Sequence, residues 1–203
     1  MFAASTADST TAVEVRPQPV VVPAGQARPL VGEPLPWWAM VLLGVGATAV
    51  LGAAVWSAAH LQPDPELRTA ALFVHLAALV VGFGAVIAVD WFALLWLLGR
   101  RSLGDLTNVA SAAHLPIWLG LTGLVLTGAL CQPDLALPLT WLKLGLVLLV
   151  MLNGLYAYAV GERLVRVVPD VAPRGLLRNA AVVAALSQFG WWGAVIIGFV
   201  NAQ

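Results

Sequence analysis

The 203-residue chain is 61% hydrophobic and only 10% charged, and its mean hydropathy is +0.91. Soluble domains are about 45–50% apolar and about 25% charged, so this composition excludes an ordinary water-soluble protein. The formal net charge of zero gives no overall field that would attract nucleic acid, and a single cysteine excludes an intramolecular disulfide or a CxxC motif.

The first 36 residues are rich in Ser, Thr, Ala, Val and Pro and contain no apolar run long enough to span a membrane. We interpret residues 1–36 as a disordered tail. Asp8 and Glu14 come before Arg16, whereas a secretory signal begins with a basic segment followed by an apolar one. We therefore expect the tail to be retained.

Five apolar stretches follow the tail. A helix needs about 20 apolar residues to cross roughly 30 Å of hydrocarbon, and the stretches at 37–59, 70–99, 109–131, 138–160 and 179–200 meet this requirement. Turn-forming segments rich in Pro, Asp and Gly separate them. Small residues recur within the spans, as in Gly120-x-x-Gly123, and allow helices to approach closely. The predicted fold is all-α, with residues 37–203 forming a compact bundle of about five transmembrane helices.

The basic residues predict the orientation of the bundle, because cytoplasmic loops carry an excess of Lys and Arg. The second loop contains Arg100 and Arg101, the first loop contains only Arg68, and the third loop contains none. The fourth loop is also basic, with Arg163, Arg166, Arg174 and Arg178. This pattern predicts a multi-pass protein of the bacterial cytoplasmic (inner) membrane, with the N-terminus in the cytoplasm and the C-terminus outside.

Ionisable side chains inside a span are costly and are therefore functional candidates. Counting about 1.5 Å per residue from the span ends sorts the polar residues of the spans into two levels. His75 and Lys143 lie at an outer level. A second, inner level contains Asp90, His114, Asn153 and Gln188.

The outer level admits two interpretations. His75 is either an axial haem ligand or metal ligand, or a histidine that donates to a backbone carbonyl at the headgroup edge. His60 is its best outer companion, although its position at the end of the first span favours a solvated side chain. Lys143 either neutralises a buried anion such as a haem propionate, or extends its ammonium outward to the interface.

At the inner level, Asp90 and His114 can form a carboxylate–imidazole pair that relays protons or binds a cation or metal. They can equally be a structural pair that joins two helices. Asn153 and Gln188 are candidates for the same relay, or are hydrogen-bond partners between helices. The third span also contains Pro116, which is expected to kink the helix beside His114.

One set of features resembles a known family. From about residue 72 to 163 the chain contains His75-Leu76, then Gly82-Phe83-Gly84, a basic loop, Leu126-Thr127-Gly128 and finally Trp141-Leu142-Lys143-Leu144. This order resembles the superfamily of four-helix bacterial membrane proteins that includes the copper-resistance D domains and the HemJ-type protoporphyrinogen oxidases. The resemblance implies that His75 is associated with haem and Lys143 with an active site.

Other functions stay open beside this one. Ala71-x-x-x-His75 and Ala110-x-x-x-His114 resemble the Ala-x-x-x-His motif of bacterial light-harvesting polypeptides, which implies a chlorophyll-type pigment. A subunit without a cofactor, within a larger respiratory or photosynthetic complex, is a further alternative, as is proton, cation or copper transport. Copper import is disfavoured because the spans contain few of the soft ligands that Cu(I) prefers.

The leading prediction is a membrane protein that binds a haem-type tetrapyrrole for electron transfer or tetrapyrrole handling, with enzymatic activity left unassigned. Its expected surroundings are the lipid bilayer and either other membrane subunits or a second copy of the chain, with no role for nucleic acid.

Overall fold

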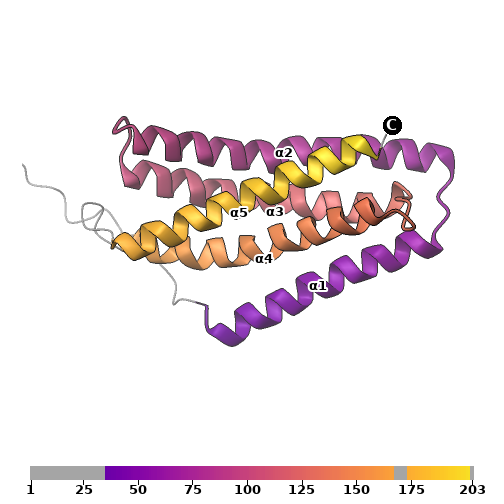
Figure 1. The fold of residues 1–203 in the computed structure, drawn as a ribbon, viewed down its shortest axis with the longest axis horizontal. Helices are drawn as coiled ribbons and strands as arrows, with labels where there is room; N and C mark the ends of the chain where they lie inside the picture. Colours follow the sequence, from indigo (N-terminus) through magenta and orange to yellow (C-terminus); the bar gives the residue numbers. More distant parts are fainter. Residues whose placement is uncertain (1–34, 167–172, 202–203) are drawn as a thin grey trace, which may run out of the picture. The chain divides into compact units, whose positions relative to one another are not determined.

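The computed structural model describes residues 35–166 and 173–201, which form five α-helices and, within those ranges, no strand (Figure 1). The helices are α1 (Trp37–His60), α2 (Pro65–Leu97), α3 (Leu103–Leu130), α4 (Pro138–Arg166) and α5 (Arg174–Val200). All five are long and apolar enough to cross a membrane. The predicted all-α fold with five spans is confirmed, and helix length and hydropathy make this a multi-pass membrane protein. The predicted disordered tail lies, up to residue 34, outside the described residues.

Helices α2, α3 and α5 begin before the apolar stretches from which they were predicted, and polar caps explain this for α2 and α3. Asp64 caps α2, since its carboxylate accepts a hydrogen bond of 2.8 Å from the backbone N–H of Leu67. Ser102 and Asp105 form a capping box at the start of α3, with reciprocal hydrogen bonds of 3.1 Å. Polar first turns therefore extend both helices beyond the apolar segment.

Two ends of the bundle can be distinguished by their residues. Loops 61–64 and 131–137 lie at one end, where α5 also terminates, and we call it the proline end after Pro63, Pro65, Pro133 and Pro138. At the other end α2 passes into α3, α4 terminates and α5 begins. We call it the basic end after Arg100, Arg101, Arg163, Arg166, Arg174 and Arg178. The proline end corresponds to the predicted outer side.

The tightest helix packing joins α2 to α3. A methyl group at Gly120 would lie 2.6 Å from the carbonyl oxygen of Ala78, and one at Gly123 would lie 2.8 Å from the Ala78 Cβ. Both distances are too short for a real side chain, so the two backbones approach each other because these residues are glycine. We refer to α2 and α3 as the first helix pair.

Helices α4 and α5 form a second pair in the same way. A methyl group at Gly190 would lie 2.5 Å from Val150 Cγ2, and one at Gly193 would lie 2.7 Å from Leu146 Cδ1. Side chains of α4 thus occupy the space that glycines leave open on α5. Helix α1 packs more loosely, against α3 and α4.

The two pairs meet through larger side chains. Phe83 of α2 stacks on Trp191 of α5, with ring centroids 5.5 Å apart, and both belong to the buried core. We call the contact between α2 and α5 the seam. Away from the core, large apolar side chains such as Phe73 and Val80 point outward, 74% and 73% exposed, as expected for side chains that contact lipid.

Candidate functional site

The hydrogen bonds around His75 fix the state of its imidazole ring. His75 is half-buried on α2, and its Nδ1 lies 3.0 Å from the Thr127 hydroxyl of α3. Thr127 donates its only hydroxyl proton to the carbonyl of Gly123, at 2.5 Å. Its oxygen must therefore accept the proton on Nδ1. This arrangement assigns the Nδ1–H tautomer, in which Nε2 carries no proton. The ring also has a hydrogen bond with the Leu124 backbone of α3, in line with the alternative in which His75 donates to a backbone carbonyl.

Small residues make room for this histidine. Gly128 follows Thr127, and a methyl group there would already contact the ring, 3.5 Å from His75 Cε1. The same stretch of α3 thus supplies the acceptor for the ring and the open space beside it. The local sequence explains both the acceptor and the space, because Thr127 and Gly128 are adjacent residues on the side of α3 that faces α2.

Lys143 reaches the same level from α4. Its Nζ would lie 3.3 Å from a methyl group at Gly198, so the ammonium crosses to the last turns of α5. It interacts electrostatically with the His75 ring and with the Cys131 thiol. The half-buried ammonium has no hydrogen-bond or ion-pair partner among residues 35–166 and 173–201. The two residues assigned to the outer level by counting are therefore brought together.

Arg68 and Cys131, which were not among the site residues predicted from the sequence, complete this end. Arg68 of α2 donates to the Gln132 side chain at 3.5 Å, which places a second cation beside the turn that follows α3. Burial raises the pKa of the Cys131 thiol above its usual range, against the opposing effect of the Lys143 and Arg68 cations. The thiol is therefore neutral at pH 7. We call His75, Thr127, Lys143, Cys131 and Arg68 the proline-end site.

The other two histidines lie elsewhere. His60 is exposed at the end of α1, where its ring stacks on Trp56 and its Nδ1 lies 2.8 Å from the Trp56 carbonyl oxygen. His114 is 13 residues from Thr127, about 20 Å along α3, so it does not share a site with His75. No group of three His, Cys, Asp or Glu able to hold a metal ion occurs within the described part of the chain.

The residues of the predicted inner level form three separate contacts. Gln188 of α5 donates to the Asp90 carboxylate of α2. Asn153 of α4 donates to the Val183 carbonyl of α5 at 2.9 Å. The His114 ring lies 5.1 Å from the ring of Tyr158 on α4. No hydrogen bond or ion pair joins Asp90 to His114 among the residues that the structure describes, so Asp90 pairs with Gln188 instead.

Trp191 is a buried polar residue that sequence reasoning missed. It is only 3% exposed, and its indole N–H has no hydrogen-bond partner in the described ranges. A methyl group at Gly82 would lie 3.2 Å from Trp191 Cη2, so the indole lies directly against α2. A signal was present in the sequence, since Trp191 lies nine residues from the end of α5 and three residues after Gln188, on the same helical face.

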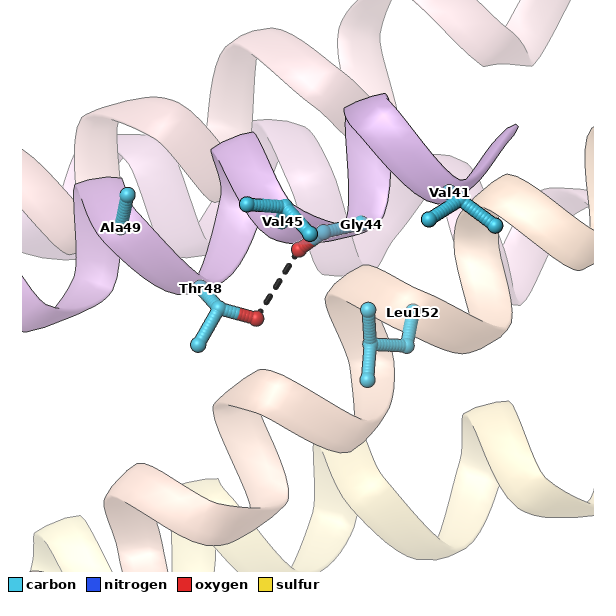
Figure 2. Close-up of a pocket in the computed structure, with 6 residues that line it drawn as sticks. All are labelled: Val41, Gly44, Val45, Thr48, Ala49 and Leu152. Atoms are coloured by element: carbon cyan, nitrogen blue, oxygen red, sulfur yellow. Dashed lines mark hydrogen bonds between the residues drawn. The ribbon is translucent and has the colours of Figure 1, made fainter. Parts of the chain in front are cut away.

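A shallow groove between α1 and α4 lies away from these residues (Figure 2). It is lined by Val41, Gly44, Val45, Thr48, Ala49 and Leu152. Its one hydroxyl, on Thr48, donates to the Gly44 carbonyl of its own helix at 2.9 Å. With no titratable group and a satisfied hydroxyl, the groove offers an apolar surface suited to a lipid chain and no chemistry.

Comparisons with known proteins found no matching family model, no similar curated protein and no similar solved structure.

Proposed function

We propose that this protein binds a haem-type tetrapyrrole at the proline-end site, with Nε2 of His75 as an axial ligand. One observation carries the proposal: the hydrogen-bond chain from His75 through Thr127 to Gly123 holds the ring in the tautomer that a metal ligand requires. Metal-binding histidines generally donate their second N–H to a protein group in this way. Haem iron is commonly held by a single histidine of this kind.

Among the three histidines, only His75 is placed to form an axial bond to a haem iron at this site. His60 is turned toward its own helix and His114 lies in the other half of the bundle, so a pair of histidines on one iron is not part of the proposal. A bound haem would supply one-electron transfer at this end of the bundle. The resemblance to the copper-resistance D and HemJ-type proteins agrees with the choice of His75 and Lys143.

Lys143 supplies the complementary charge. A half-buried ammonium without an anionic partner is unfavourable, and a charge-assisted hydrogen bond to a carboxylate relieves this cost. Haem propionates are carboxylates that can fill this role. We therefore assign Lys143 to a propionate, with Arg68 as the more exposed second cation of the site.

The basic end faces the cytoplasm in this proposal, because positively charged loops are retained there. The proline-end site then lies toward the outer face of a bacterial inner membrane. Labelling single cysteines placed at Arg100 and at Asp134 of a Cys131→Ser protein in intact cells tests this orientation, since only Asp134→Cys should react with an impermeant maleimide. Labelling of Arg100→Cys alone would reverse it.

The absorption spectrum of the detergent-purified full-length protein tests the tetrapyrrole. We expect a Soret band that is lost in His75→Gly and restored when imidazole is added to that variant with haem. His60→Ala is the matched control and should keep the band. A folded preparation from haem-replete cells that stays colourless, and does not change the spectrum of added hemin, would refute the proposal, as would a chlorophyll spectrum.

A further inference from the structure

One face of α5 carries a row of contacts along the seam. Gln188, Trp191 and Gly198 are spaced i, i+3 and i+10, so they share a helical face. Gln188 binds Asp90, and Trp191 packs on Phe83. The backbone at Gly198 lies against the Lys143 ammonium. This face therefore leads from Asp90, past a buried indole, to the proline-end site.

The indole N–H of Trp191 requires an acceptor that residues 35–166 and 173–201 do not provide. Buried donors are almost always paired, and an orphan of this kind marks the position of water or another bound group. Here the donor belongs to the residue at the middle of the row, whose six-membered ring packs against the Gly82 backbone. An acceptor for the Trp191 N–H therefore has to come from water or another bound group.

Asp90 has unused acceptor positions on the same seam. A carboxylate can accept about four hydrogen bonds, and Gln188 supplies one. In a membrane the remaining positions need water or a proton, because an ionised carboxylate there is costly. Asp90 lies seven residues from the end of α2, about 10 Å, so the basic end is the nearer source of both.

We infer that the seam holds a chain of water molecules that conducts protons between the basic end and the proline end, with Asp90 as the proton-accepting group and the Trp191 N–H anchoring the chain at its centre. A hydronium ion gives a proton to the Asp90 carboxylate and becomes water, and the carboxylic acid then gives the proton to the next water of the chain, which becomes hydronium. Only O–H bonds are made and broken, and each transfer moves one positive charge along the bundle. This inference does not depend on a bound tetrapyrrole.

The distances along α2 suit short water chains. Asp90 is seven residues from Phe83 and Phe83 is eight residues from His75, so Trp191 divides the path into steps of about 10 and 12 Å. At about 2.8 Å per hydrogen bond, each step needs three or four waters. The path differs from the relay predicted from sequence, because His114 and Asn153 make their contacts away from the seam.

Proton flux into proteoliposomes tests the inference. The full-length protein is reconstituted without haem into vesicles that contain a pH-sensitive dye, and a potassium diffusion potential drives the flux. We expect flux above that of protein-free vesicles, its loss in Asp90→Asn and its retention in Asp90→Glu. Trp191→Phe should lower the flux about tenfold, the rate effect of losing one buried hydrogen bond.

Trp192→Phe is the matched control for Trp191→Phe. Trp192 also contacts the Phe83 ring but is half exposed, so the same loss of an indole N–H should leave the flux unchanged. His114→Gln should also conduct normally.

Wild-type flux no greater than that of empty vesicles, equal effects of the two Trp variants, or loss of flux in His114→Gln would each overturn the inference. Far-UV circular dichroism and gel filtration identify a variant that has not folded. If a variant has not folded, the wild-type protein is tested by NMR, in which a cross-peak between water and the Trp191 indole N–H is expected. The absence of this cross-peak also overturns the inference.

Discussion

Substituting Gly120 with alanine tests whether the close approach of α2 and α3 builds the proline-end site. The added methyl group would lie 2.5 Å from the Gly82 nitrogen and 2.6 Å from the Ala78 carbonyl oxygen. These are backbone atoms of α2, so no side chain can rotate away and the helices must separate. Overpacking of this kind typically costs about 1–3 kcal/mol.

The gain in helix propensity opposes this cost only in part. Replacing an interior helical glycine by alanine is worth up to about 1 kcal/mol. The Gly84→Ala variant reports the gain in helix propensity alone, because a methyl group at Gly84 meets nothing within 4 Å. We therefore expect Gly84→Ala to be neutral or stabilising, and Gly120→Ala to be less stable than Gly84→Ala by about 2 kcal/mol.

Reversible unfolding in mixed micelles, with detergent as denaturant, measures both free energies of unfolding. Separation of α2 from α3 should also break the hydrogen bond between His75 and Thr127, so that haem retention falls in Gly120→Ala and not in Gly84→Ala. Equal stability of the two variants would refute the packing that we describe. A loss of stability with unchanged haem retention would show that the site does not depend on this contact.

Three further changes have defined outcomes. Thr127→Val removes the acceptor that holds His75 and should weaken haem affinity about 10- to 100-fold in a hemin titration, whereas Thr127→Ser should preserve it. Gln188→Leu leaves Asp90 without its protein partner and should cost about 1–3 kcal/mol in thermal unfolding; adding Asp90→Leu should recover much of that loss, and strict additivity would contradict the pairing. Cys131 should react slowly with a maleimide at pH 7 and faster as pH rises, because its pKa is raised. Lys143→Met removes a cation that lowers this pKa, so the reaction should become slower still, and an unchanged rate would place Lys143 away from the thiol.

The sequence was sufficient for the number of helices and their approximate limits, because length and hydropathy alone decide which segments can cross a bilayer. It was less informative about helix ends. Asp64 and Ser102 begin α2 and α3 in polar segments that lie outside any apolar run. Caps of this kind are recognisable in sequence, but only when local hydrogen bonding is considered beside hydropathy.

The depth of each polar residue in the bundle could also be predicted, by counting residues from the span ends. This counting placed His75 and Lys143 at one level, and the structure brings them close enough to interact. The hydrogen-bond and charge partners of these residues could not be predicted in the same way, because they depend on how each helix is rotated and which helix lies opposite. Asp90 therefore contacts Gln188 of α5 and not His114 of α3. Tryptophan is typical of membrane interfaces, so Trp191 does not stand out by residue type, and its distance from the end of α5 is the sequence signal that it is buried.

The distribution of these contacts between the helix pairs bears on function. Glycine packing already joins the members of each pair, so their stability does not require charged groups. The neutral Asn153 amide adds a hydrogen bond within the second pair, to the Val183 carbonyl. By contrast, the hydrogen bond of Asp90 with Gln188 and the electrostatic interaction of Lys143 with His75 each cross from one pair to the other. Charged groups in a membrane are costly, and here they are concentrated where the packing is least dependent on glycine. The interface between the two pairs is therefore the place where we expect chemistry, whereas the contacts within each pair hold the helices together.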